Sequence, residues 1–228
     1  MKKALLACVV VAALVAVPIA LSAVDITSQQ WRVFNVKPDT SSYWDINHVV
    51  KDAAGALLVP IQQFESPTTG SFAVYLVNNY NVNLTGKTLT ASMFWTPGTY
   101  KTRSTVFAGA YVRFEFQDVA SGPYDSNDYW WSTVSLDLNA GSSGDLAASL
   151  ADRTLWTNQA GKSATDTTTN WMDWTGSVVA MSPYDGFTRA LKKVKQLSLS
   201  FGSAGSYASG VAFDGGTATI TVLKVEVK

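Results

Sequence analysis

The residues best suited to bind a ligand are aromatic and hydrogen-bonding side chains that alternate along two stretches of the chain. The first stretch contains YVRFEFQD and the second reads DYWWSTVSLDL. Side chains alternate between the two faces of a β-strand, so one face of each stretch is apolar and the other mixes rings with polar groups. The mixed face is predicted to contact a ligand through Tyr111, Arg113, Glu115, Gln117, Tyr129 and Trp131.

These residue types suit a carbohydrate. Aromatic rings can pack against the C–H faces of a sugar, and planar polar groups can hydrogen-bond its hydroxyls. Only 15% of the residues are charged while 12% are aromatic, which favours a neutral oligo- or polysaccharide as the partner. The alternative is that these rings reflect strand propensity alone and that the chain is a structural or adhesive cell-envelope protein. An apolar patch at an exposed edge strand would favour that alternative.

Catalytic chemistry has less support in the sequence, and no catalytic residue is predicted. A glycoside hydrolase, the less favoured alternative, needs two carboxylates about 5–10 Å apart. The three glutamates are Glu65, Glu115 and Glu226, and Glu115 with Asp137 would be the best pair. The only histidine, His48, has no neighbouring partner, and no G-x-S-x-G motif is present. One histidine also makes a zinc site remote.

An acidic loop follows the first stretch and contains Asp118, Asp125, Asn127 and Asp128. Calcium prefers clustered carboxylate and carbonyl oxygens, so this loop is a candidate calcium site. Asp and Asn also favour turns through local hydrogen bonds, and that interpretation is preferred. We therefore expect no cofactor or metal ligand, with calcium as the open alternative.

The two stretches are predicted to form neighbouring strands that bury their apolar face. That face belongs to the core and comprises Val106, Ala108, Ala110, Val112, Phe114 and Phe116, and Trp130, Val134, Leu136 and Leu138. Trp130 and Trp131 are adjacent, so alternation sends Trp130 into the core and Trp131 to the exposed face.

The remaining periodicities predict an all-β fold. Further strands are expected at 30–36, 71–78, 88–96, 145–150, 196–201 and 217–228. The apolar phase changes within 217–228, which indicates a β-bulge or burial on both sides. Asp214-Gly215-Gly216 is predicted to be a hairpin turn. Ser182 and Pro183 begin one short helix that extends to Val194. These elements indicate an antiparallel two-sheet β-sandwich, a jelly roll, with a single-sheet barrel as the alternative.

The N-terminus has the anatomy of a secretory signal peptide. A basic start, Met1-Lys2-Lys3, precedes an uncharged apolar run, and cleavage is expected after Ala23. The alternative is an uncleaved membrane anchor. Cleavage would remove Cys8, the only cysteine, and leave one β-sandwich domain over 24–228 that is secreted, periplasmic or at the cell surface. This domain would have 15 basic against 17 acidic residues, so neither nucleic acid nor, after cleavage, membrane is an expected partner.

The order of these features resembles the galactose-binding-like jelly roll of bacterial carbohydrate-binding modules. Four stretches carry the resemblance: LTGKTLTASMFW (84–95), YVRFEFQD (111–118), LADRTLWTNQAG (150–161) and VKQLSLSFGSAGSYASGVAFDGGTATITVLKVEV (194–227). The resemblance implies a secreted β-sandwich that binds carbohydrate without cleaving it. Many family members hold a structural calcium with an acidic residue on the last strand, whereas Ile220 to Lys224 contains no Asp.

Overall fold

The structure is a computed structural model of the 228-residue chain. It describes residues 23–36, 43–64, 70–76, 80–102, 109–118, 125–173, 175–202 and 210–228, with the backbone alone at 35–36, 43–48 and 70–76. The predicted signal peptide lies outside these ranges except for Ala23. Within them, no helix combines the length and the apolar character that a membrane crossing requires.

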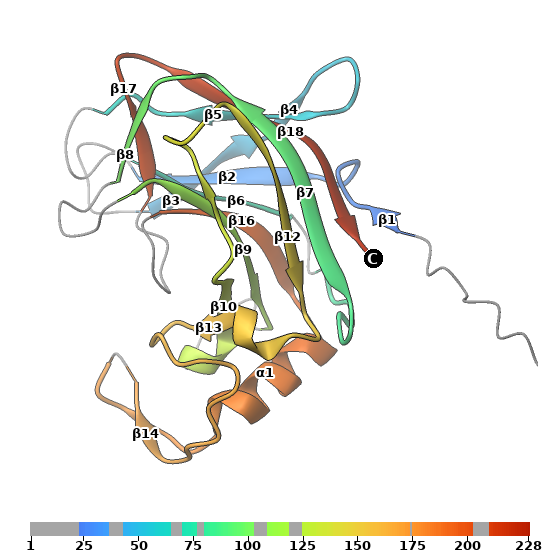
Figure 1. Cartoon of the computed structure of the whole chain (residues 1–228), viewed down its shortest axis with the longest axis vertical. Helices are drawn as coiled ribbons and strands as arrows, with labels where there is room; N and C mark the ends of the chain where they lie inside the picture. Colours follow the sequence, from blue (N-terminus) through green and yellow to red (C-terminus); the bar gives the residue numbers. More distant parts are fainter. Residues whose placement is uncertain are drawn as a thin grey trace, which may run out of the picture.

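Two antiparallel sheets form most of the fold (Figure 1). The six-stranded sheet has the order β12-β7-β18-β5-β4, with β1 beside β18. Its strands are β1 (Val24–Asp25), β4 (Val50–Lys51), β5 (Leu57–Ile61), β7 (Thr88–Trp95), β12 (Ser143–Ser149) and β18 (Ala218–Val227).

The ten-stranded sheet has the order β13-β10-β9-β16-β6-β17-β8, with β11 beside β9, and β2 pairing with both β6 and β3. Its strands are β2 (Trp31–Val36), β3 (Tyr43–His48), β6 (Gly70–Leu76), β8 (Thr99–Thr102), β9 (Tyr111–Gln117), β10 (Tyr129–Ser132), β11 (Leu136–Asp137), β13 (Trp156–Asn158), β16 (Gln196–Gly202) and β17 (Val211–Asp214). A separate hairpin pairs β14 (Trp171–Met172) with β15 (Val178–Val179).

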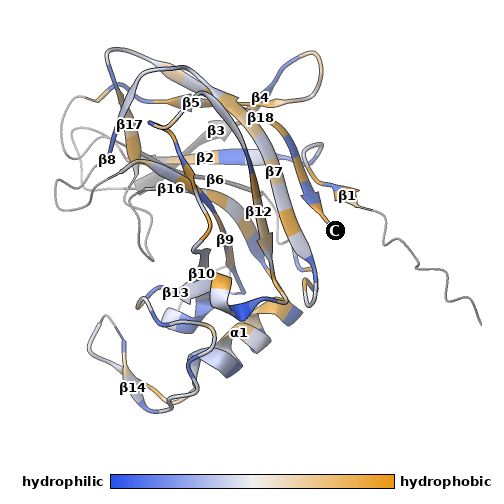
Figure 2. Cartoon of the chain, viewed as in Figure 1, coloured by the Kyte–Doolittle hydropathy of each residue, from blue (hydrophilic) through white to orange (hydrophobic). Residues whose placement is uncertain are grey.

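The core lies between the two sheets. Along β7 buried and more exposed residues alternate, and the residues buried from solvent are Leu89, Ala91, Met93 and Trp95. Figure 2 shows apolar residues along β7 and β18 of this sheet. The buried residues of β7 belong to one apolar cluster with Phe114, Phe116, Leu197 and Leu199 of the other sheet. Burial of one face of each sheet against the other confirms the predicted all-β sandwich.

Two details of the C-terminal region test the sequence predictions. The pairing of β18 with β7 shifts register between Val222 and Lys224, which confirms the predicted bulge and leaves the side chain of Leu223 exposed. The predicted hairpin at Asp214-Gly215-Gly216 is wrong, because β17 and β18 pair in different sheets. The glycines instead carry the chain from one sheet to the other, with φ angles of 122° and 129° that other residues rarely adopt.

The predicted helix is confirmed as α1 (Pro183–Lys192), which lies at one end of the sandwich (Figure 1). The Ser182 hydroxyl caps it by accepting a hydrogen bond from the Asp185 backbone N–H at 3.1 Å. Its apolar face inserts Phe187 against Trp130, with ring centroids 5.0 Å apart. Two 3-10 turns, η1 (Ser126–Asp128) and η2 (Arg153–Leu155), precede β10 and β13 at the same end.

Candidate functional site

The apolar face of β9 and β10 is in the core, as predicted. Ala110, Val112, Phe114, Phe116 and Trp130 are all at most 1% exposed. Leu138 is equally buried, whereas Val134 and Leu136 pack against the core with partial exposure. Val106 and Ala108 lie outside the described residues.

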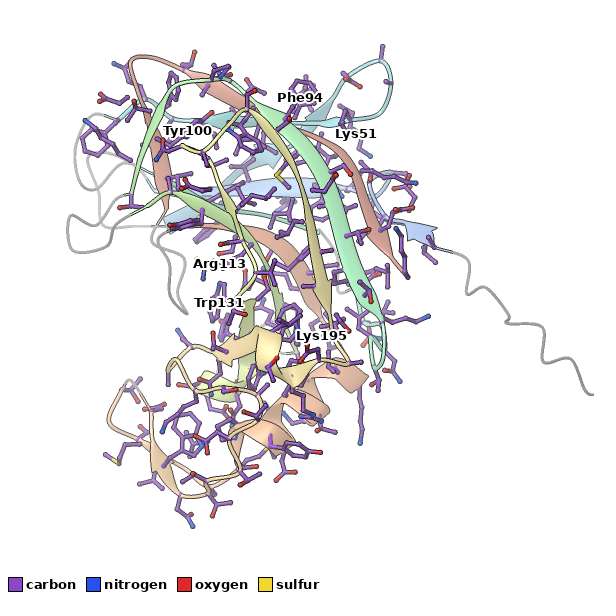
Figure 3. All side chains as sticks on the ribbon, viewed as in Figure 1. Lys51, Phe94, Tyr100, Arg113, Trp131 and Lys195 are labelled. Atoms are coloured by element: carbon purple, nitrogen blue, oxygen red, sulfur yellow. The ribbon has the colours of Figure 1, made fainter. Side chains whose placement is uncertain are left out.

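Strand register brings the predicted ligand-contacting residues together on the opposite face. Strand β9 lies between β10 and β16, so Glu115 is paired with Trp131 on one side and with Ser198 on the other. Figure 3 shows Arg113 and Trp131 on these neighbouring strands. We call this surface the polar face and define it as Tyr111, Arg113, Glu115, Gln117, Tyr129, Trp131, Gln196, Ser198 and Ser200.

Hydrogen bonds between strands order the polar face. The Trp131 indole N–H donates to the Ser200 hydroxyl at 3.1 Å, and the Ser198 hydroxyl donates to the Glu115 carboxylate. Nearer the loop, the Gln117 amide donates to the Gln196 side-chain oxygen at 2.7 Å. These bonds satisfy groups that would otherwise be costly to remove from water.

The expectation that this face is openly exposed is wrong. Glu115 is only 7% exposed, Arg113 6%, Gln117 6% and Trp131 2%. Trp131 is covered in part because its ring stacks on Tyr129, with centroids 6.0 Å apart and an angle of 14° between the planes. Tyr111 and Tyr129 are half-buried. The polar face therefore has a buried floor of charged and polar groups and a tyrosine rim that solvent reaches.

Burial changes the acid–base properties of the floor. It raises the pKa of Glu115 from 4.5 to about 7, although the hydrogen bond from Ser198 lowers it somewhat. Burial also lowers the pKa of the Arg113 guanidinium. Near neutral pH both forms of the Glu115 carboxyl are populated, so it can donate or accept a hydrogen bond. Carboxyl groups with such raised pKa values are concentrated at functional sites.

The pairing of Asp137 weakens the two-carboxylate alternative. Asp137 is opposite Tyr111, which is four residues along β9 from Glu115. Four residues of extended strand span about 13 Å, which is more than a glycoside hydrolase of either stereochemical class uses between its carboxylates. The geometry does not bring this predicted pair together.

Strand β16 contributes residues to the polar face that were not predicted to contact a ligand. The run QLSLSFG lies in the strand predicted at 196–201, and its Leu197, Leu199 and Phe201 are buried in the core. Alternation along the strand places Gln196, Ser198 and Ser200 on the other face. The pairing of β16 with β9 could not be read from periodicity, because the two strands are about 80 residues apart in the chain.

The acidic loop is organised by a guanidinium from α1. Arg189 Nε donates to Asp118 Oδ2 at 2.9 Å, one Nη donates to Asp128, and the other lies 3.7 Å from Asp125. Asp125 also caps η1 by accepting from the Asn127 backbone N–H at 2.6 Å. Burial raises the pKa of Asp118 and that of Asp128, the latter to about 6. The carboxylates thus act in a turn and in an ion-pair network that attaches the loop to the helix.

Calcium should not affect the stability of this loop. Adding calcium, or a chelator, should leave the melting temperature of the chain unchanged, because the Arg189 guanidinium already lies among the three carboxylates. Among the residues the structure describes, no group of three or more His, Cys, Asp or Glu side chains could hold a metal ion. Differential scanning fluorimetry measures the effect, and a rise with calcium that a chelator reverses would establish a calcium site.

The other acid–base candidates lie elsewhere. Glu226 on β18 forms ion pairs with Lys224 at 2.6 Å and Lys228 at 3.3 Å, so its carboxylate has a structural role. The backbone of His48 at the end of β3 is paired with Arg32. Glu65 lies outside the described residues.

Comparisons with known proteins give only distant likenesses. No protein-family model and no curated protein matches the chain. A solved structure of the alginate lyase AlyC3 in complex with dimannuronate aligns over 89% of both chains, at 11% identity and a TM-score of 0.38. The structure of a marine algae virus of the order Picornavirales aligns over 89% of this chain and 69% of its own, at 15% identity and a TM-score of 0.23. Likenesses this distant do not assign the chain to a family.

Proposed function

We propose that the polar face binds a neutral oligo- or polysaccharide and that the chain is a secreted, non-catalytic carbohydrate-binding protein. The observation that supports the proposal is the composition of the buried floor. Arg113, Glu115, Gln117 and two serines lie there, although desolvating charged and polar groups is costly. A role confined to stability would be served better by apolar residues, so these buried polar groups support a role in ligand recognition.

The polar face matches the chemistry of a sugar. The half-buried Tyr129, whose ring stacks on the buried Trp131, offers aromatic surface for C–H groups. Amide, carboxyl and hydroxyl groups beside the rings can donate to and accept from sugar hydroxyls. Glu115 can take either role because its pKa is about 7.

Tyr129→Ala should weaken glycan binding without unfolding the domain. Tyr129 is half-buried, and its ring covers Trp131, so its removal takes away accessible aromatic surface. We expect a loss of about tenfold in affinity, typical of an aromatic contact residue. Isothermal titration calorimetry would measure it with the best ligand from a glycan array.

Tyr184→Ala is the matched control for Tyr129→Ala. Tyr184 is 41% exposed on α1, away from the polar face, and should bind as the parent does. Equal affinities of the Tyr129 variant and the parent, or no binding to any glycan on the array, would remove the basis of the proposal.

A structural or adhesive role is the second candidate, favoured by the β14–β15 hairpin. Met172 and Val178 are paired across the two strands and are 59% and 64% exposed. Exposed apolar residues side by side on a short two-stranded sheet are the expected mark of an association surface. If the chain has this role, no sugar should bind at the polar face, so the binding measurements distinguish the two candidates.

A further inference from the structure

We propose that the binding site extends beyond the polar face to Arg32 and Phe34 of β2. Its ligand is then an unbranched oligosaccharide chain lying across the strands, with a monosaccharide or disaccharide filling only one end. This inference rests on the proposed carbohydrate-binding function and specifies the ligand class of the same site. It is carried by the register of five adjacent strands.

Two rows of paired residues connect the polar face to β2. The first row crosses the sheet from β10 to β2, and its paired residues are Trp131, Glu115, Ser198, Tyr75 and Arg32. The second row runs in the order Arg113, Ser200, Ala73 and Phe34. Directly paired residues lie on the same face of a sheet, so the register places Arg32 and Phe34 on the face that carries Glu115 and Arg113.

Burial along β2 supports this assignment of faces. Trp31 and Val33 are 1% and 3% exposed and belong to the core. Arg32 and Phe34 alternate with them and therefore lie on the face opposite the core, where both are half-buried. The far end of the surface thus repeats the chemistry of the near end, with one aromatic ring and one guanidinium.

The dimensions set the size of the ligand. Trp131 and Arg32 are four strand spacings apart, which is about 19 Å at the usual distance between paired strands. A disaccharide is too short to contact both ends, whereas a longer chain can lie on Tyr129, which covers Trp131, at one end and on Phe34 at the other. Aromatic residues at both ends, each with a guanidinium nearby, suit a chain with repeated C–H faces and hydroxyls.

Affinity measured against chain length tests the extension. Cello-, xylo-, manno- and laminari-oligosaccharides, from disaccharide to octasaccharide, would be titrated into the full chain by calorimetry, with oligouronates as a charged comparison. Affinity should rise with length until the chain spans the rows and then level off. Phe34→Ala should lower the affinity for the longest chains about tenfold and leave that for the disaccharide unchanged.

Two further variants separate a loss of contact from a loss of structure. Phe94→Ala is the matched control, because Phe94 is 45% exposed on β7 in the other sheet (Figure 3) and should bind every length as the parent does. Arg32→Gln keeps a polar side chain at the far end and should show the same selective loss for long chains. It carries the test if thermal melting shows that Phe34→Ala is unfolded.

The outcomes distinguish this inference from the proposed function. Equal affinity for disaccharide and octasaccharide, with Tyr129→Ala still weakening both, would overturn the extension and keep the carbohydrate site. Equal weakening of all lengths by both Phe34→Ala and Arg32→Gln would also overturn it. If no oligosaccharide of any length binds, the proposed function fails and the extension fails with it.

Discussion

Replacing Trp131 by alanine should lower the free energy of unfolding by about 3–5 kcal/mol, as much as the same change at the adjacent Trp130. Both side chains are buried, with 2% exposure at Trp131 and 0% at Trp130. Trp130 packs against Phe187 of α1, and Trp131 stacks on Tyr129 and donates to Ser200. Each variant loses a large ring from a packed site, so the urea midpoint should fall in both.

Phe94→Ala is again the control for tryptophan removal, because loss of this exposed ring should lower the free energy of unfolding by no more than about 1 kcal/mol. A Trp131 variant that unfolds at the same urea concentration as the parent would contradict the burial of the polar face. Substitutions that test binding on this face should therefore be made at the half-buried Tyr129, where a change in affinity can be separated from a change in folding.

Glu115→Gln should stabilise the chain at about pH 8 by about 3 kcal/mol, with the gain disappearing as the pH falls to about 4.5. The folded-state pKa of Glu115 is about 7 instead of 4.5, so the ionised form is disfavoured by burial. Each pKa unit corresponds to about 1.4 kcal/mol. Above pH 7 the parent bears the whole cost of this charge. As the pH falls, the folded protein binds a proton that the unfolded chain does not, so its stability rises.

Urea unfolding at several pH values measures this effect as the difference between parent and variant. The difference is needed because Asp128, whose pKa is raised to about 6, and Asp118, whose pKa is also raised, change the stability of both proteins in the same direction. Glutamine keeps an oxygen that can accept from Ser198 and cannot ionise. A difference that does not vary between pH 4.5 and 8 would show that Glu115 ionises as freely as in the unfolded chain.

Local periodicity was sufficient to predict much of the sandwich. Alternation placed Phe114, Phe116 and Trp130 in the core, and a hydroxyl followed by proline marked the start of α1. The change of apolar phase predicted the bulge between Val222 and Lys224. Each of these features is set by residues close together in the chain.

Features that depend on distant pairing were not available from the sequence. Alternation showed that Trp131 and Glu115 share a face, but it could not show that Ser198 and Ser200 would lie beside them. It could not reveal the burial of that face either, because coverage depends on the tertiary arrangement. The Asp214-Gly215-Gly216 turn has the composition of a hairpin, and only the pairing of β17 and β18 in different sheets excludes one.

The acidic loop illustrates the same limit for charge. Asp118, Asp125 and Asp128 are close in sequence and suggested either a turn or a calcium site. Their partner, Arg189, is about 60 residues further along the chain, on α1. The contact between loop and helix requires Gly186, where a Cβ atom would lie 2.5 Å from a side-chain carbon of Asn127. No local pattern connects these residues.

The indole N–H resonance of Trp131 gives the most direct test of carbohydrate binding at the polar face. A ¹⁵N-labelled full chain, with this resonance assigned from Trp131→Phe, would be titrated with the hexasaccharides of the four neutral series. We expect the Trp131 resonance to move, because its N–H donates to Ser200 beside Glu115. Trp95 and Trp171 donate to backbone carbonyls outside the polar face, so their resonances should stay in place. Movement at Trp171 alone, or no movement with any hexasaccharide, would contradict carbohydrate binding at the polar face.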